Sequence, residues 1–168
     1  KQNVFAPLGM KSSRYNEHPA LVPNSASGYY WELDSFIRAP IENLALSFAS
    51  SGIYSSVEDL LRWDQALYKE KLVSRRSLEE IFNAYTKGAP EGEQFSYGYG
   101  WNIGTKFDRK SISHSGRHNG FKAYILRFPS ERVTVLVQAN NDRANAGRTG
   151  TNIAAIVFGA PYTEPIEQ

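Results

Sequence analysis

Cysteine is absent from this sequence of 168 residues. Its absence excludes disulfides, thiolate nucleophiles and thiolate metal sites, but it does not fix the compartment, because exported proteins can also lack cysteine. No apolar run approaches the ~18 residues that a membrane-spanning helix needs. The first residues, Lys1-Gln2-Asn3, include no initiator methionine and no secretory signal. We therefore expect Lys1 to be a cut end.

The sequence also has no large excess of positive or negative residues. Lys and Arg number 19, Asp and Glu number 17, the net charge is +2, and no block of like charges occurs. This distribution argues against a nucleic-acid-binding surface, which needs clustered Lys and Arg residues. The apolar content of 41% and the aromatic content of 13% are those of a globular protein long enough to bury one core.

The first third of the chain lacks a sustained period. Residues 1–54 are rich in Pro, Gly, Ser and Asn, so we predict long ordered loops there. The first helix is expected to begin at Ser55 or Ser56. Each serine is followed three residues later by an acid, Glu58 or Asp59, as in a capping box.

Beyond the first helix the period changes from helical to strand-like. A second helix is predicted after Ser74 and should end at Lys87–Pro90; its apolar face consists of Leu78, Ile81, Phe82 and Tyr85. Four strand-like segments follow, at residues 97–103, 112–115, 121–128 and 132–139. The turn-forming residues 129–131 should join the last two segments as an antiparallel hairpin with apolar residues on both faces.

A closing helix is expected over residues 145–158, where Gly159 and Pro161 end it. The order of elements predicts an α+β fold in one partial domain, residues 1–168. Within it we expect a loop and helical region (1–95), antiparallel strands (96–140), a C-terminal helix (141–160) and a tail (161–168).

Five segments resemble, in order, the serine β-lactamase and D,D-peptidase (penicillin-binding protein) superfamily, in its class C and esterase-like branch. They are PLGM at residues 7–10, ASSGIYSSVEDL at 49–60, YGYGW at 97–101, HSG at 114–116 followed by GF at 120–121, and FP at 128–129 leading to VLVQAN at 135–140. The resemblance covers residues 5–140 and implies the C-terminal part of the β-lactamase/transpeptidase-like fold. In that part a C-terminal helix packs on antiparallel strands, accompanied by two helices and long loops.

The resemblance also implies roles for the third motif of the family, Lys/His-Thr/Ser-Gly. His114 would take the cationic position, and Ser115 would offer its hydroxyl to the substrate carboxylate. Gly116 would let the substrate approach the strand closely, because it has no side chain. The backbone N–H of Arg117 would supply one oxyanion-hole donor. Histidine in place of the commoner lysine leaves the pH dependence of the reaction open.

The other two motifs of the family are missing. Its nucleophile lies in Ser-x-x-Lys, and its second motif is Tyr-x-Asn or Ser-x-Asn; no serine or tyrosine of this sequence fits either pattern. In the family both motifs precede the PLGM segment. We therefore expect this chain to be the C-terminal fragment of a serine hydrolase, without acyl-enzyme chemistry of its own.

Several candidate functional residues also have a purely structural interpretation. Tyr29, Tyr30 and Trp31 are expected either to line a substrate rim or to pack under a long loop. His114 and His118 suggest a metal pair, but Gly116 between them and the absence of a neighbouring acidic ligand argue against it, so neither a metal nor a cofactor is expected. GRTG at residues 147–150 fits a helix terminus better than a phosphate loop. We interpret Asp59 and Asp64 as a helix cap and a solvated helix face.

Three hypotheses follow. In the first, the serine hydrolase of which this chain is a fragment would hydrolyse a β-lactam, a D-alanyl peptide or an ester through an acyl-enzyme. Alternatively, the chain is a non-catalytic binding or assembly module on the same scaffold, or an unrelated α+β binding domain. The strand from about Val133 should present an open edge, so we expect either a missing N-terminal segment or a dimer to cover it. The resemblance implies an extracytoplasmic location: periplasmic, membrane-anchored or secreted.

Overall fold

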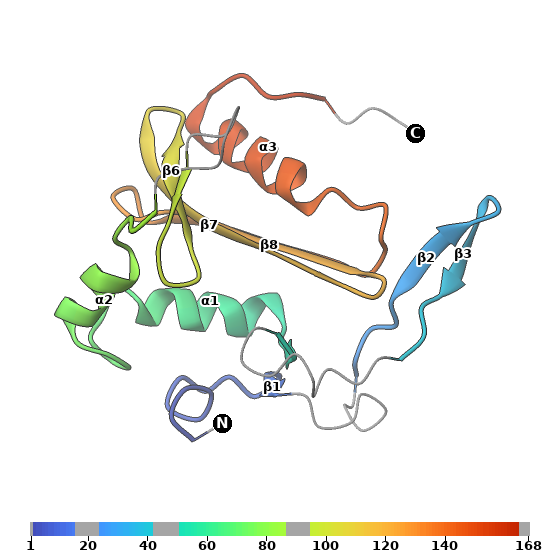
Figure 1. Cartoon of the computed structure of the whole chain (residues 1–168), viewed down its shortest axis with the longest axis horizontal. Coiled ribbons are helices and arrows are strands. Elements are labelled where there is room, and N and C mark those ends of the chain that lie inside the picture. The colour runs from blue at the N-terminus through green and yellow to red at the C-terminus, as the bar shows by residue number, and fades with distance from the viewer. Residues whose placement is uncertain (1, 16–23, 42–50, 87–94, 165–168) are drawn as a thin grey trace. The chain divides into compact units, whose positions relative to one another are not determined.

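The computed structural model of the chain describes residues 2–15, 24–41, 51–86 and 95–164 (Figure 1). The predicted helix stop at Lys87–Pro90 lies outside these residues, as does the beginning of the second family-like segment. The chain divides into two compact units. One consists of Lys1–Arg75, Arg117–Lys122 and Gln138–Ala144, and the other of Arg76–Gly116, Ala123–Val137 and Asn145–Gln168.

A five-stranded antiparallel sheet dominates the C-terminal half of the chain. Its strands, in both chain order and sheet order, are β5 (Phe95–Tyr97), β6 (Asn102–Lys106), β7 (Arg109–His118), β8 (Phe121–Phe128) and β9 (Val133–Ala139). The strands predicted at 121–128 and 132–139 are confirmed to within a residue. The predicted strand at 112–115 is the middle of the longer β7.

The prediction of one strand over 97–103 is wrong, because the chain reverses between β5 and β6. The N–H of Gly98 donates to the carbonyl of Trp101 over 2.8 Å, and Gly100 has a φ of +76° that side chains rarely tolerate. β6 and β7 are joined by Phe107 and Asp108, both with positive φ, as in a two-residue hairpin turn.

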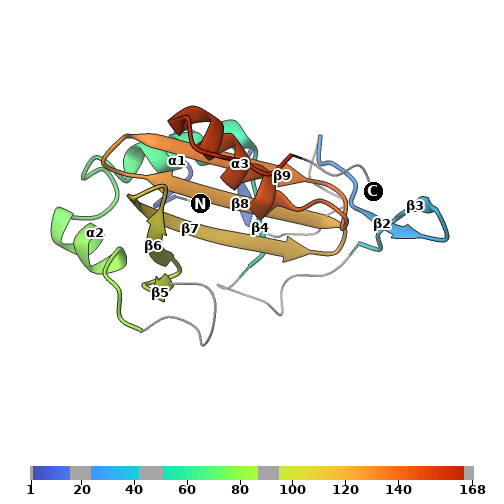
Figure 2. The ribbon, with the colours of Figure 1, turned by 90° about the horizontal axis from the view of Figure 1, so that it is seen from above.

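Helix α3 (Ala146–Phe158) packs on one face of this sheet, as Figures 1 and 2 show. The side chain of Asn145 caps its N-terminus, and Gly159 ends it in the left-handed conformation, as predicted. The core beneath the helix is formed by apolar side chains of β8, β9 and α3: Leu126, Phe128, Val135, Ala154 and Phe158. A β-carbon on Gly150 would lie 2.7 Å from the Tyr124 ring, so the glycine permits the close approach of helix to sheet.

The side chain of Arg127 leaves β8 between Leu126 and Phe128 and is fully buried. Its guanidinium lies 5.1 Å from the ring centroid of Phe82 and 5.8 Å from that of Trp101, which favours the charge through cation–π contacts. Within this unit β8 is therefore covered on both faces at Leu126, Arg127 and Phe128.

Helix α2 (Arg75–Ile81) is shorter than predicted. At its C-terminal end, Phe82 N–H donates to the Leu78 carbonyl and Asn83 N–H donates to the Glu80 carbonyl. Tyr85 does not continue the helix: its N–H bonds the Tyr97 carbonyl over 3.0 Å, and its ring packs against Tyr99. Pairing with the strand therefore ends the helical period early.

The prediction of loops alone over residues 1–54 is wrong in part. β1 (Arg14–Tyr15) pairs with β4 (Ile53–Tyr54), and β2 (Tyr29–Glu32) forms a hairpin with β3 (Ser35–Arg38). The hairpin turn, Leu33-Asp34, has positive φ at both positions. Such turns usually contain Asn-Gly or Asp-Gly, so this one carried no recognisable signal.

Helix α1 (Val57–Ala66) begins as predicted, with Ser56 accepting a hydrogen bond from the N–H of Asp59. The interpretation of Asp64 as part of a solvated helix face is wrong, and the side chain of Asp59, which was interpreted as part of the cap, is not exposed either. Both are buried, with 1% and 0% of their surface exposed. Asp59 instead accepts hydrogen bonds from Ser12 N–H and the Ser13 hydroxyl, so it fastens an earlier loop to the helix. Among the residues that the structure describes, no helix is long and apolar enough to cross a membrane.

Candidate active site

His114 lies on β7 at the point where the strand loses its neighbour on one side. The ladder between β6 and β7 runs from Lys106–Arg109 to Asn102–Ser113 and ends there. From His114 onward β7 has β8 on one side and, within the described residues, no strand on the other. β7 is thus internal over its first half and an edge strand over the half that carries the HSG motif. Free backbone groups at an edge can pair with an extended ligand.

The three residues after His114 are exposed: Ser115, Gly116 and Arg117. A β-carbon built on Gly116 would meet only the β-carbon of Ala123, at 3.5 Å, an ordinary contact. The packing of the described residues therefore does not require glycine at this position. The role of Gly116 in admitting a substrate stays a prediction.

Tyr97 contacts His114 directly. Its hydroxyl lies 2.9 Å from Nε2 of the imidazole, and the two ring centroids are 6.0 Å apart. The backbone of Tyr97 is held on both sides: its N–H donates to the Thr86 hydroxyl over 3.0 Å, and its carbonyl accepts from Tyr85 N–H. The tyrosine therefore reaches the histidine from a fixed piece of backbone.

The residues of the YGYGW segment have different structural roles. Gly98 is required for packing, because a β-carbon there would lie 2.7 Å from the carbonyls of Ile81 and Asn83. Tyr99 stacks on Tyr85 and is 65% exposed. Trp101 is buried beside Phe82. Within this segment, Tyr97 contacts the predicted site residue His114.

The predicted rim residues Tyr29 and Tyr30 belong to the other unit. Tyr29 is docked by its backbone, with N–H to the Asn140 carbonyl at 3.0 Å and carbonyl to Asp142 N–H at 3.1 Å. Tyr30 lines a pocket of about 250 Å³ together with Arg117, His118 and Lys122 at the end of the β7–β8 hairpin. Of the predicted site residues, Tyr29, Tyr30 and Arg117 thus belong to one unit, and His114, Ser115 and Gly116 belong to the other.

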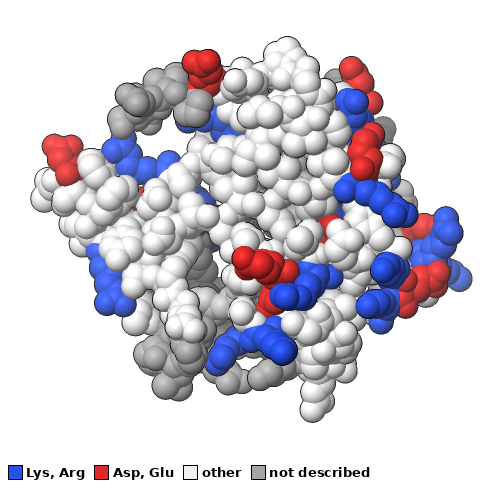
Figure 3. Space-filling view, turned by 180° about the vertical axis from the view of Figure 1, so that it is seen from behind, with Lys and Arg blue, Asp and Glu red and all other residues white. Residues whose placement is uncertain are grey.

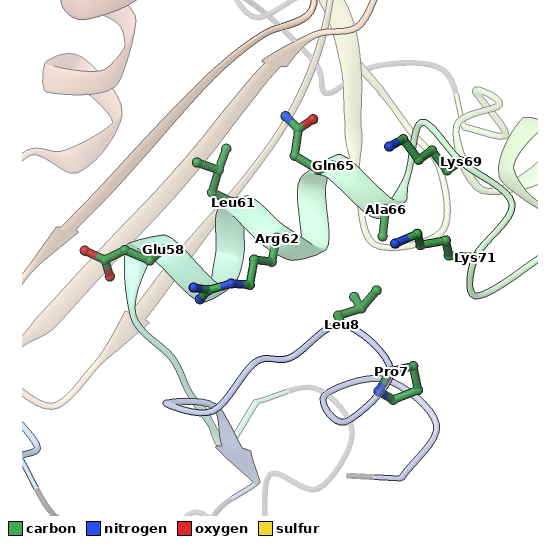
Figure 4. Close-up of a pocket in the computed structure, with 9 residues that line it drawn as sticks. All are labelled: Pro7, Leu8, Glu58, Leu61, Arg62, Gln65, Ala66, Lys69 and Lys71. Atoms are coloured by element: carbon green, nitrogen blue, oxygen red, sulfur yellow. The ribbon is translucent and has the colours of Figure 1, made fainter.

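A larger pocket of about 420 Å³ holds none of the predicted site residues (Figure 4). It lies between the PLGM turn and helix α1. Pro7, Leu8 and Leu61 line its apolar part, and Figure 4 shows Lys69 and Lys71 together at one end. The PLGM segment therefore forms one wall of a hollow beside α1.

One ring nitrogen of His118 is engaged within its own turn. Its Nδ1 accepts a hydrogen bond from the N–H of Asn119 over 2.8 Å, within the hairpin turn. Across the described ranges no group of three or more His, Cys, Asp or Glu side chains is suited to hold a metal ion. The residues around His114 can instead donate hydrogen bonds and a cationic charge to an anionic ligand on the open edge.

Sequence reasoning missed Tyr97 as a site residue. It lies 17 positions before His114, and only the return of the chain through β6 brings the two together. The aromatic residue inside a glycine-flanked segment was a signal, but nothing in the linear pattern indicated its partner.

The Beta-lactamase family model matches residues 1–159. Penicillin-binding protein 4* of Bacillus subtilis (strain 168) is 29% identical over 180 residues, covering 98% of this chain and 40% of that protein. A D-aminopeptidase of Gluconobacter oxydans (strain 621H) is 25% identical over 162 residues, covering 95% of this chain and 30% of that protein. The chain therefore spans less than half the length of these curated relatives.

Among solved structures, the octameric penicillin-binding protein homologue from Pyrococcus abyssi matches with a TM-score of 0.82 at 24% identity. The match covers 95% of this chain and 36% of that chain. This likeness confirms the predicted α+β fold of the β-lactamase/transpeptidase type. Because the family model covers most of the sequence, the chain belongs to the Beta-lactamase family.

Proposed function

We propose that this chain forms the third-motif side of the active site of a β-lactamase-like serine hydrolase. The reaction is acyl transfer: a serine hydroxyl attacks the acyl carbon of a β-lactam, a D-alanyl peptide or an ester, and water then releases the acyl group. The observation that carries the proposal is the position of HSG on the half of β7 that, among the described residues, has a neighbouring strand on one side only.

Each residue of the motif has a physical task in this reaction. The backbone of the open edge pairs with the extended acyl chain. His114 and Ser115 hold the substrate carboxylate, one as a cation or donor and the other through its hydroxyl. The N–H of Arg117 donates to the oxygen that becomes negative when the serine attacks, a contribution worth about 100- to 1,000-fold in rate.

The attacking serine comes from outside these 168 residues, because no serine here is followed three positions later by lysine. The sequence also lacks the second motif, Tyr-x-Asn or Ser-x-Asn. We call the combination of this chain with the polypeptide encoded upstream in the same reading frame the assembled hydrolase. The chain alone forms no acyl-enzyme. An extracytoplasmic location is part of the same proposal.

The outer edge of β9 is the surface that the upstream polypeptide, or a second copy of this chain, would cover. β9 ends the sheet order and contains no charged residue. On α3 the apolar residues Ile153, Ile156 and Val157 share one side at helical spacing and are 41%, 60% and 56% exposed. Figure 3, seen from behind, shows few charged side chains over this part of the surface. Such an edge beside an apolar helix face favours association.

The proposal is tested by incubating the chain with a fluorescent penicillin and measuring its intact mass, alone and with the upstream segment added. We expect no adduct on the chain alone and a covalent adduct on the serine of the added segment in the assembled hydrolase. An adduct on the chain alone would contradict the absence of a nucleophile. Folded assembly without any adduct would favour the alternative, a binding module on this scaffold.

A further inference from the structure

We infer that Tyr97 is a positioning residue for His114: its phenol donates a hydrogen bond to Nε2, which fixes the ring and keeps the ring proton on Nδ1. The consequence for catalysis rests on the proposed function. The hydrogen bond and the position of the proton are properties of this chain alone and can be measured without activity.

The geometry favours a fixed pair over a chance contact. The distance between the Tyr97 hydroxyl and His114 Nε2 is 2.9 Å, and the rings meet at an interplanar angle of 57°. Tyr97 pairs with Asn102 of β6, and Asn102 pairs with Ser113, the residue before His114. Three neighbouring strands therefore set the separation of the two side chains. The Tyr97 N–H donates to the Thr86 hydroxyl, and the Tyr97 carbonyl accepts from Tyr85 N–H. These two bonds fix the position of the Tyr97 backbone.

The chemistry of the two groups decides the direction of the bond. A neutral imidazole has one N–H and one bare nitrogen, whereas a phenol can both donate and accept. A phenol O–H is a stronger hydrogen-bond donor than a neutral imidazole N–H, and the bare imidazole nitrogen is a stronger acceptor than the phenol oxygen. The phenol therefore donates to Nε2 while the ring is neutral. When the ring is protonated, Nε2–H donates to the phenol oxygen instead, so the pair persists in both states.

This arrangement leaves Nδ1 as the functional nitrogen of the ring. No other hydrogen bond to His114 from a described side chain is present, so Nδ1–H is available to an incoming ligand. A carboxylate accepts from such a donor, in keeping with the role assigned to this motif. Without the Tyr97 hydroxyl, the ring would exchange its two neutral tautomers and lose its fixed orientation, which costs rate when a substrate must be held accurately.

The test is nitrogen-15 NMR of the imidazoles in the labelled chain over a pH series, with the His114 signals assigned by His114→Gln. The matched variants are Tyr97→Phe and Tyr99→Phe. Tyr99 lies two residues further on, and its hydroxyl has no hydrogen-bond partner among the described residues. Cooperative thermal unfolding of each variant shows that it is folded.

At the high-pH plateau we expect His114 of the wild-type chain to be mainly in the Nδ1–H form. Tyr97→Phe should shift the tautomer ratio toward Nε2–H about fivefold, the effect of one net hydrogen bond, and Tyr99→Phe should leave it unchanged. A wild-type ring mainly in the Nε2–H form would overturn the inference, even if Tyr97→Phe failed to fold. An equal ratio in wild type and Tyr97→Phe would overturn it as well.

The functional consequence has a separate readout. In the assembled hydrolase, Tyr97→Phe should lower the acylation rate and change its pH profile, while Tyr99→Phe should change neither. Absence of all acylation in the wild-type assembly would remove the proposed function and leave the tautomer result standing. Normal acylation with a normal pH profile in Tyr97→Phe would overturn the positioning role and leave the proposed function intact.

Discussion

The Ser13 hydroxyl donates a buried hydrogen bond of 2.9 Å to the carboxylate of Asp59, across 46 positions of the chain. The same carboxylate oxygen accepts from Ser12 N–H at 2.7 Å, and the other oxygen accepts from the Arg62 guanidinium. Ser13 also contacts the Ser55 hydroxyl at 2.8 Å. One buried carboxylate thus joins the loop before β1 to the N-terminus of α1.

Replacement of Asp59 by Ala should therefore destabilise the chain by about 2–3 kcal/mol, because Ser12 N–H and the Ser13 hydroxyl lose a charged acceptor. Chemical denaturation measures the change in the free energy of unfolding. Glu70→Ala, which removes an exposed carboxylate beyond the same helix, is the control and should change it by less than about 0.5 kcal/mol. Equal effects of the two substitutions would show that the network contributes nothing.

Gly120, in the turn between β7 and β8, should not tolerate a side chain. Its φ is +67°, and a β-carbon would overlap the backbone nitrogen of Tyr29 and lie 2.7 Å from the Gly28 carbonyl carbon. Gly9 is a matched control, because its φ of +66° is the same but nothing lies within 4 Å of its β-carbon position.

We expect Gly9→Ala to cost about 1 kcal/mol, the conformational penalty alone, and Gly120→Ala to cost at least about 2 kcal/mol more. Thermal unfolding of the two variants gives the comparison. If both lost the same stability, the close contact between this turn and the Tyr29 backbone would be absent in solution.

Gly116→Ala should separate function from folding. The added β-carbon would touch only Ala123, so the melting temperature should remain close to that of the wild type. In the assembled hydrolase the methyl group would displace the substrate on the open edge, and acylation should slow about tenfold or more. Gly147→Ala on α3, where only Asn145 lies near, is the control for both measurements. Unchanged acylation in Gly116→Ala would argue against substrate binding at this residue.

Glu58 gives a prediction about pH. Hydrogen bonds from its own backbone N–H and from the Ser56 side chain hold the pKa of its carboxyl below the ordinary value of 4.5. The ionised form therefore stabilises the folded state, and its contribution is present above the ordinary value and lost as the pH falls through the lowered pKa. The stability difference between wild type and Glu58→Gln should shrink as the solution is acidified. An NMR titration of Glu58 that gave a pKa of 4.5 or above would contradict this.

Local patterns in the sequence predicted the elements whose signals are local. Ser56 caps α1, Asn145 and Gly159 bound α3, and the strand over 121–128 is present, because caps, turns and alternation act over a few residues. The HSG motif was likewise visible, since three consecutive residues carry it.

Features that depend on distant partners could not be predicted. Asp59 was interpreted as part of the helix cap because it follows Ser56 by three residues, and that local pattern gives no sign of its hydrogen bonds to Ser12 and Ser13 in a distant loop. The buried Arg127 depends on Phe82 and Trp101, which lie on other elements. Tyr97 contacts His114 because the chain reverses at Gly98–Trp101. Nothing in the sequence indicated this turn, because the segment alternates as a single strand does.

The central claim is that the open half of β7 forms part of an acyl-transfer site. The most direct measurement is the second-order rate constant for labelling of the assembled hydrolase by a fluorescent penicillin, in wild type, His114→Ala and Lys110→Ala. Lys110 is an exposed cation on the other half of the same strand, paired with Thr105. The account predicts labelling about 100-fold slower in His114→Ala and nearly unchanged in Lys110→Ala. Labelling of a folded His114→Ala at the wild-type rate would contradict it.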